Sequence, residues 1–201
     1  MPVVMLPVMG EGLGPREVEI KLAVRSAAWA RRQLASKGFR SLHKRTLQRD
    51  VVLDSPTGTL RRAGALLRLR RAGGAAWITY KGPAAPGRHK NREELELRLS
   101  ARAAAQLEQI LGRLGFRAVF RYEKYRTEFG QAGRSGVVAL DETPIGVFLE
   151  LEGTPRWIDR TARKLGFTES DYITATYAEL YLEDCRRRGH KPADMLFATA
   201  G

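Results

Sequence analysis

Charged and apolar side chains alternate along several short segments, which is the pattern of strands with one charged and one apolar face. With turn residues as boundaries, this alternation predicts strands at 16–24, 41–53, 64–72, 75–82, 91–99, 117–129, 135–141 and 145–152. Helical spacing of apolar residues predicts helices at 26–37, 100–114, 155–165 and 171–188. Ser26 and Ser100 are the expected caps of the first two helices. Short turns such as Gly73-Gly74 require antiparallel pairing, so the order of elements indicates an α+β fold.

Three of the predicted strands carry two glutamates one residue apart and lead into a predicted helix that ends near a Gly-Phe pair. The glutamate pairs are Glu17 with Glu19, Glu94 with Glu96, and Glu150 with Glu152. Because side chains alternate across a strand, each pair places both carboxylates on one face. Carboxylates gathered on like faces indicate a site for a hard divalent cation.

The charged faces of these strands have two interpretations. On a single strand, a charged face is more often simply solvated while the apolar face packs on helices. Here five strands repeat the pattern, and the apolar stripes of the helices need the apolar strand faces to cover them. If the sheet closes with its helices outside, its interior is charged. Such an interior, with acids and bases mixed, is suited to a divalent metal that holds a polyphosphate.

Composition narrows the partners without choosing among them. In 201 residues, 35 Lys and Arg against 22 Asp and Glu give a net charge of +13, so the natural partners are anions: nucleic acid, an acidic membrane surface or a polyphosphate. The lone Cys185 excludes an internal disulfide framework and a cysteine-based zinc cluster, which fits the cytoplasm. We interpret residues 1–15 as a flexible extension rather than a signal peptide, and no segment is long enough to span a bilayer.

The ordered set of motifs resembles the CYTH superfamily, also called triphosphate tunnel metalloenzymes. The resemblance runs from about Arg16 to Tyr181, which places the domain at 16–185 and a C-terminal tail at 186–201. It is carried by Glu17-x-Glu19-x-Lys21, Leu-Arg68-Leu-Arg70, Trp77-Ile-Thr-Tyr-Lys81-Gly-Pro, Glu94-x-Glu96, Lys124-x-Arg126, Leu140-Asp141 and Glu150-Leu-Glu152. The resemblance implies an eight-stranded antiparallel β-barrel, the triphosphate tunnel, with helices packed outside.

The resemblance also implies roles for single residues. The metal ligands, for Mg²⁺ or Mn²⁺, would be Glu17, Glu19, Asp141, Glu150 and Glu152. The triphosphate would be bound by Lys21, Arg68, Arg70, Lys81, Lys124 and Arg126. The catalytic group would comprise Lys21, Glu94 and Glu96, with the two glutamates orienting metal-bound water. Simpler roles remain open for Lys81, a possible surface lysine, and Asp141, a possible turn residue.

The chain departs from the family at the position of a general base. Relatives carry tyrosine and a second aromatic after the residues that match Arg49-Asp50, whereas this chain has Val51-Val52-Leu53. A base formed by Lys21 and such a tyrosine is therefore in doubt, and water activation would depend on metal and carboxylates. Tyr80 and Tyr177 are alternatives that the sequence does not place. The histidines, at positions 43, 89 and 190, are expected to be exposed, and residues 82–90 to form a mobile basic loop.

The implied activity is hydrolysis of a triphosphate, with tripolyphosphate, ATP or thiamine triphosphate as candidate substrates. The alternative is a class IV adenylyl cyclase that forms cyclic AMP and pyrophosphate in the same tunnel. A second alternative is a polyphosphate or nucleic-acid binding module without catalysis, for which nucleic acid is the less expected partner. The protein is expected to be a monomer or homodimer, with the last helix covering a mouth of its own barrel or pairing with a second copy.

Overall fold

Nine antiparallel strands form the centre of the computed structural model, which describes residues 15–133 and 135–198. Apart from Pro15, the expected N-terminal extension lies outside the described residues. The strands are β1 (Arg16–Val24), β2 (Arg40–Ser41), β3 (Thr46–Asp54), β4 (Leu66–Ala72), β5 (Ala75–Lys81), β6 (Lys90–Leu99), β7 (Arg117–Gly130), β8 (Val137–Thr143) and β9 (Gly146–Glu152).

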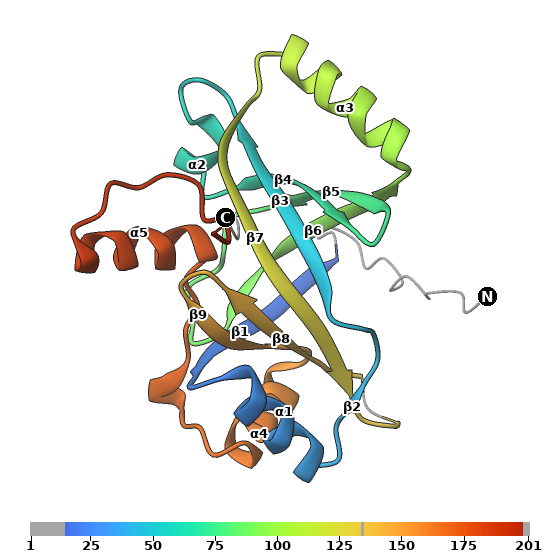
Figure 1. The fold of residues 1–201 in the computed structure, drawn as a ribbon, viewed down its shortest axis with the longest axis vertical. Helices are drawn as coiled ribbons and strands as arrows, with labels where there is room; N and C mark the ends of the chain where they lie inside the picture. Colours follow the sequence, from blue (N-terminus) through green and yellow to red (C-terminus); the bar gives the residue numbers. More distant parts are fainter. Residues whose placement is uncertain (1–14, 134, 199–201) are drawn as a thin grey trace.

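The sheet closes on itself. Its order is β2-β7-β3-β4-β5-β6-β1-β9-β8, and β8 pairs again with β7. The two-residue β2 only extends the edge beside β7, so eight strands make the closed barrel (Figure 1). The expected eight-stranded antiparallel barrel with helices outside is confirmed. Closure leaves the barrel strands without a free edge and creates an interior face.

The helices lie outside this barrel, and all except the short α2 begin at a Ser or Thr cap. They are α1 (Ala27–Ser36), α2 (Thr59–Arg62), α3 (Ala101–Arg113), α4 (Pro155–Lys164) and α5 (Tyr177–Arg188), with a 3₁₀ turn at Glu169–Asp171. Ser26 and Ser100 accept hydrogen bonds from Trp29 N and Ala103 N, as expected for caps of α1 and α3. Figure 1 shows α1 and α4 side by side below the barrel, and α3 at the opposite end.

The outward faces of the strands supply the cores on which the helices pack. Leu34 of α1 and Ile158 of α4 are fully buried with Ile20, Leu149 and Leu151 of β1 and β9. A smaller core lies between α3 and the outer face of β3, β4 and β5. The apolar faces are thus covered by helices, and the charged faces of the same strands point into the barrel.

Helix α5 packs on side chains that point inward. Its Tyr177 forms one cluster with Tyr122 and Phe148, whose strand positions face the lumen. Val52 and Phe120 border the same cluster. The helix therefore covers part of the interior of its own barrel, which was one of the two expected arrangements.

Several element boundaries differ from expectation. The predicted strand 41–53 is divided into β2 and β3, because Arg45 turns aside to pair with Glu142 at 2.9 Å and to lie over the Tyr125 ring. The short α2 was not predicted; the Asp54 carboxylate starts it by accepting hydrogen bonds from the backbone N–H groups of Leu60 and Arg61. The last helix begins at Tyr177 rather than residue 171, since Thr176 and Glu179 form a capping box there.

Two segments expected to be loose are packed. In the loop 82–90, Arg88 and His89 both contact Asp159 of α4 at 2.7 Å. In the segment expected to be a tail, α5 continues to Arg188, and Met195 is buried where its backbone pairs beside Tyr122. Alternating strand patterns do not reveal such contacts, because they join single side chains far apart in the chain.

Candidate active site

The interior of the barrel is a charged cavity of about 300 Å³. Strand register places Lys21 opposite Glu150 and Arg70 opposite Asp50, whereas it brings two acids together where Glu19 lies opposite Glu152. The cavity is lined by most of the predicted site residues, namely Glu17, Glu19, Lys21, Arg68, Arg70, Lys81, Glu94, Glu96, Lys124, Arg126, Glu150 and Glu152. Asp141, the remaining predicted site residue, lies directly behind this lining.

One part of the cavity is dominated by carboxylates. Lys81 Nζ contacts Glu17 at 2.6 Å and Glu94 at 3.1 Å, so a single ammonium links β5 to β1 and β6. Glu152 has no such partner among the described side chains. Although Glu152 keeps part of its surface open to solvent, desolvation at the cavity, followed by repulsion from Glu17, Glu94 and Glu19, raises its pKa to about 7. A region where a carboxylate resists ionisation has an excess of negative charge that a cation would relieve.

Lys21 lies between two carboxylates in the middle of β1. Its ammonium contacts Glu19 at 3.2 Å and Glu150 at 3.1 Å. Burial opposes its charge, but the two glutamates outweigh burial and raise the pKa of Lys21 above its usual value. Lys21 is therefore a permanent cation in this cavity rather than a proton acceptor.

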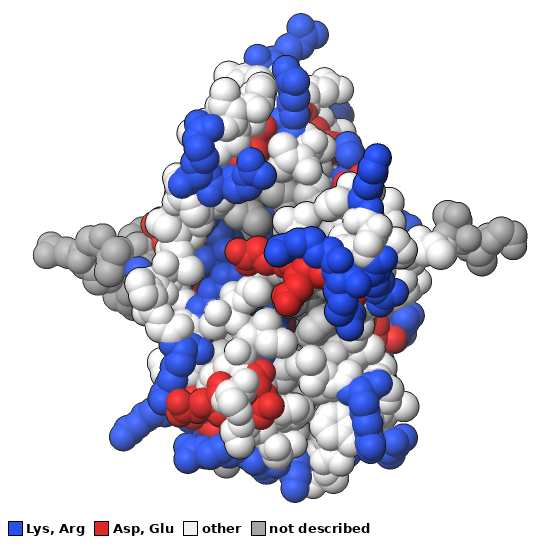
Figure 2. Space-filling view, turned by 90° about the vertical axis from the view of Figure 1, so that its left-hand side faces the viewer, with Lys and Arg blue, Asp and Glu red and all other residues white. Residues whose placement is uncertain are grey.

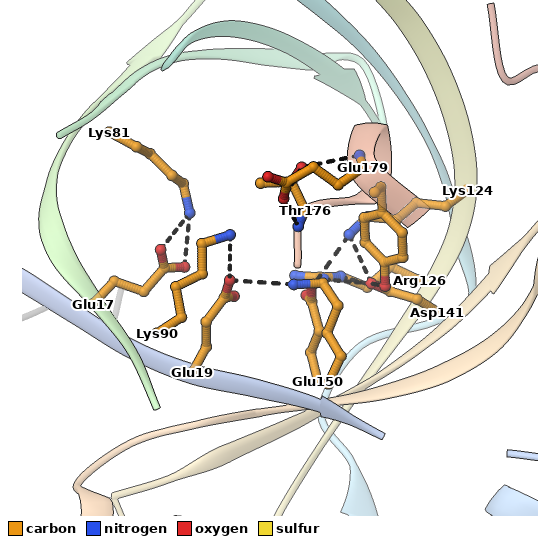
Figure 3. Close-up of polar contacts among 12 residues, drawn as sticks. Glu17, Glu19, Lys81, Lys90, Lys124, Arg126, Asp141, Glu150, Thr176 and Glu179 are labelled. Atoms are coloured by element: carbon orange, nitrogen blue, oxygen red, sulfur yellow. Dashed lines mark hydrogen bonds and ion pairs between the residues drawn. The ribbon is translucent and has the colours of Figure 1, made fainter. Parts of the chain in front are cut away.

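Asp141 is the centre of a buried network behind the cavity wall. Its oxygens accept hydrogen bonds from Lys124 Nζ and from the Tyr177 hydroxyl, each at 2.7 Å. They also accept two from the Arg126 guanidinium, from Nε at 2.7 Å and from Nη2 at 2.6 Å. Arg126 also pairs with Glu150 (Figure 3). Burial alone would raise the pKa of Asp141, yet Arg126 and Lys124 hold it below its usual value. Both oxygens of the carboxylate are thus occupied by cationic or hydroxyl donors.

Arg68 and Arg70 carry donors that remain available. Arg70 Nε donates to Asp50 at 2.8 Å, and Arg68 Nε lies 3.5 Å from the same oxygen. Two guanidinium nitrogens, Arg68 Nε and Arg70 Nη2, are nevertheless buried without a hydrogen-bond partner among the described residues. Unsatisfied buried guanidinium donors are costly, and phosphoryl oxygens would satisfy them.

The sequence reasoning missed several residues that line the cavity. Lys90 and Arg92 point inward from β6, where Lys90 Nζ lies 3.7 Å from Glu19 and Arg92 Nε 3.4 Å from Glu17. Burial and the nearby Lys21 lower the pKa of Lys90 to about 8. The alternation of Glu94 and Glu96, continued backward by two residues at a time, is the signal that would have found both cations.

The aromatic residues of the cavity come from elements other than β3. Val52 of β3 packs against Tyr122 of β7 and Tyr177 of α5, and these two tyrosines line the cavity. Burial raises the pKa of both hydroxyls, and for Tyr177 the charges of Asp141 and Glu150 raise it further. Both tyrosines are consequently donors at neutral pH and not bases. Tyr80 lies on the opposite face of its strand from Thr79 and Lys81, outside the cavity.

The whole domain matches a known family. Residues 15–196 match the CYTH domain. This protein belongs to the CYTH family. The matched range ends beyond Met195, so the C-terminal segment that packs on Tyr122 is included in the match.

The CYTH relatives cover a broad range of organisms. A protein of Methanocaldococcus jannaschii, provisionally named an adenylate cyclase, is 31% identical over 136 residues, which cover 68% of this chain and 75% of the relative. A Vibrio parahaemolyticus structure with the same provisional name superposes with a TM-score of 0.71 at 21% identity, covering 83% of this chain and 98% of the other. A Hippeastrum structure, described as having a dominant triphosphatase activity, has a TM-score of 0.56 at 15% identity, with 88% and 97% covered. These two structural likenesses concern the fold.

The donor set of this CYTH barrel fits a divalent cation. Within the described residues, no three acidic, histidine or cysteine side chains are already gathered around one point, because lysines separate them. Glu17, Glu19 and Glu152 nevertheless offer hard oxygen donors on adjacent strands, and repulsion among these carboxylates adds to desolvation in raising the pKa of Glu152. Asp141 and Glu150 are engaged with Lys124 and Arg126. No helix in the described part of the chain is long and apolar enough to cross a membrane.

Proposed function

We propose that this CYTH protein hydrolyses the terminal phosphoanhydride bond of triphosphate-containing substrates with the aid of Mg²⁺ or Mn²⁺. The observation that supports this most strongly is the cavity itself, where buried basic side chains, two of them with unpaired N–H donors, line the same space as the carboxylates. Hydrolysis needs only water as nucleophile and places no demand on the group attached to the triphosphate. The triphosphatase activity described for the Hippeastrum relative agrees with this choice.

In this proposal the basic residues bind the triphosphate and neutralise its charge. Arg68 and Arg70 would direct their unpaired N–H groups at phosphoryl oxygens. Lys21, Lys81, Lys124 and Arg126 would add further positive charge from the surrounding strands. Basic side chains that carboxylate partners already hold in place stabilise the transition state more than mobile ones would. They need no reorganisation as negative charge develops on the departing group.

The carboxylates would hold the metal and orient water. Glu17, Glu19 and Glu152 are the side chains that we assign to the metal, for which Glu17 would release Lys81 and Glu19 would release Lys21. Glu150 and Asp141 would be further ligands only if they release their own basic partners. A bound divalent ion would supply charge neutralisation and a nucleophilic water. Glu94 and Glu96 lie on β6 beside Lys81 and Thr79, where they would accept hydrogen bonds from that water.

We assign Asp141 a positioning role. Four hydrogen bonds hold its oxygens, so it fixes Lys124 and Arg126 at the wall of the cavity. Tyr177 secures the same carboxylate from α5, which couples the covering helix to the substrate-binding cations. A tyrosine base is not used, since both cavity tyrosines have raised pKa values.

The competing reaction is cyclisation of ATP, which is suggested by the provisional naming of the Methanocaldococcus relative as an adenylate cyclase. It would use the same cavity, with the ribose 3′-hydroxyl attacking the α-phosphorus and pyrophosphate leaving. The two reactions are separated by their products from ATP, measured with Mg²⁺, with Mn²⁺ and with EDTA. Orthophosphate and ADP formed only with metal would support the proposal. Cyclic AMP with pyrophosphate would establish the cyclase, and binding without any turnover would identify a polyphosphate-binding module.

A further inference from the structure

The cavity continues into a second chamber of about 510 Å³. Arg70, Glu96, Arg126 and Glu128 line both spaces, so the two chambers meet at these residues. A group attached to a triphosphate in the first chamber would therefore enter the second one past the two arginines. The chemistry of the second chamber should match that group.

A half-buried tryptophan forms one side of this outer chamber. Trp77 lies opposite Arg70 in the β4–β5 register, and the next inward pair is Ala72 with Ala75. The two alanines are small, so the indole has open space beside it. The guanidinium of Arg98 lies 5.9 Å from the Trp77 ring centre. An accessible indole of this kind offers a flat surface on which another ring can stack.

Gln48 forms the facing side. It points inward from β3 at the level of Ala72 and Ala75, whereas Trp77 lies two strands away and one inward pair further along β5. Two strand spacings of about 5 Å each, together with this offset of about 7 Å along the strands, separate the two side chains and leave room for a flat ring between them. The side-chain oxygen of Gln48 is buried and has no hydrogen-bond partner among the described residues. A buried acceptor without a donor is costly, and a ligand N–H group would satisfy it.

We propose that the outer chamber binds an amino-substituted heteroaromatic ring carried by the triphosphate, with Trp77 stacking on the ring and Gln48 accepting a hydrogen bond from its amino group. The inference rests on the proposed function for the triphosphate end. A carboxamide pairs well with an adjacent amino group and ring nitrogen, as in adenine or an aminopyrimidine. A bare polyphosphate chain would use neither the indole nor an amide oxygen, which repels phosphoryl oxygens.

The test compares ATP, ITP, thiamine triphosphate and tripolyphosphate as substrates. ITP has an oxo group where ATP has its amino group, so it isolates the hydrogen bond to Gln48. We expect kcat/KM for ATP to exceed that for ITP by about tenfold in the unmodified protein, and Gln48→Leu to remove this preference. Trp77→Ala should lower the ratio of kcat/KM for ATP to that for tripolyphosphate about tenfold, and Trp77→Phe should retain most of it. Thiamine triphosphate distinguishes an aminopyrimidine from a purine as the preferred ring.

Specific outcomes would overturn the inference. If tripolyphosphate is hydrolysed but ATP and ITP react equally well, or if Trp77→Ala affects ATP and tripolyphosphate equally, the subsite is absent while the proposed function stands. If no substrate is turned over, the proposed function fails. Calorimetric titration with ATP and ITP then decides on the subsite alone: preferential binding of ATP that Gln48→Leu removes would support it, and equal binding would refute it.

Discussion

The carboxylate of Asp141 shows how much a single residue contributes to this barrel. It is fully buried, and it joins Lys124 and Arg126 of β7 to Tyr177 of α5. Buried ion pairs are costly to assemble, yet removing one partner leaves the others charged and unpaired. The network therefore stabilises the cavity wall only as long as it is complete.

We expect Asp141→Asn to lower the free energy of unfolding by about 3 kcal/mol, because the charges of Lys124 and Arg126 lose their shared acceptor. The matched control is Asp184→Asn on α5, which removes ion pairs with the exposed Arg187 and Arg188 and should cost less than about 1 kcal/mol. Denaturant unfolding measures both variants. Equal effects would show that the buried network contributes no more than surface pairs.

At the scale of elements, the contact between α4 and the strands leaves no spare volume. A Cβ atom at Gly136 would lie 2.2 Å from the ring of Trp157, which is buried in the core below the barrel. Gly112 in α3 has no atom within 4 Å of the corresponding position. Two glycines of the same domain, one before β8 and one in α3, should therefore respond oppositely to one added methyl group.

Gly136→Ala should lower the free energy of unfolding by about 2 kcal/mol, since the indole must move out of a close-packed core. Gly112→Ala should raise it by about 0.5 kcal/mol, because alanine restricts the unfolded chain and favours the helix. Thermal unfolding distinguishes the two. A neutral Gly136→Ala would mean that the contact with Trp157 relaxes without cost.

The loop 82–90 is held by Asp159 of α4 and leads directly to Lys90 in the cavity. Burial alone would raise the pKa of Asp159, but hydrogen bonds from His89 and Tyr172 and the charge of Arg88 lower it. A carboxylate with a lowered pKa in the folded state contributes stability above its unfolded pKa and loses it as the pH falls through the folded value. The anchor should therefore persist at neutral pH and weaken in acid.

Hydrogen exchange of residues 83–89 measures this anchor. We expect Asp159→Asn to lower the protection factors of the loop, that is, exchange corrected for its intrinsic pH dependence, at neutral pH. Acidification through the lowered pKa of Asp159 should do the same in the unmodified protein. Asp171→Asn, in the neighbouring 3₁₀ turn, is the control, because within the described part of the chain the Asp171 carboxylate accepts hydrogen bonds from Thr168 alone. Unchanged exchange in Asp159→Asn would show that the loop is held by other contacts.

At the scale of the whole molecule, the alternation of side chains was sufficient to predict the strands and their two faces, but not the closed barrel. The strands with charged and apolar faces, the caps of α1 and α3, and the direction of the glutamate pairs follow from local sequence. The closure of β7 on β8 does not, since it depends on register between distant segments, and the resemblance to a family supplied it. The packing of Met195 and the anchoring of His89 are long-range contacts of single side chains, which local patterns do not encode.

The site was predictable to a similar extent. Twelve of the residues predicted for it line the cavity, because a period of two fixes which face each occupies once one glutamate is placed. Lys90 was missed because the preceding loop was taken to end one residue too late. Arg92 lay inside the predicted strand 91–99, on the face of Glu94, but outside the motif Glu94-x-Glu96 on which the assignment relied. The bonding of Asp141 was not foreseeable either, since its partners come from β7 and α5.

The net charge of +13 is consistent with a polyanionic ligand, and the barrel places eight lysines and arginines around one cavity, namely Lys21, Arg68, Arg70, Lys81, Lys90, Arg92, Lys124 and Arg126. Figure 2 shows further basic side chains over the face that carries α5. Only the carboxylates inside the cavity distinguish a metal-dependent enzyme from a simple polyanion binder, because binding by counterion release depends on the basic residues alone. The central claim therefore rests on these glutamates.

The most direct test is the rate of orthophosphate release from tripolyphosphate by the unmodified protein and by Glu152→Gln. We expect EDTA to abolish the rate and Mg²⁺ or Mn²⁺ to restore it, and Glu152→Gln to lower it by at least about 100-fold, equal to about 2.7 kcal/mol. Glu93→Gln is the control, because Glu93 lies between two inward residues of β6 and faces away from the cavity. A rate that resists EDTA, or a folded Glu152→Gln variant with full activity, would contradict the account.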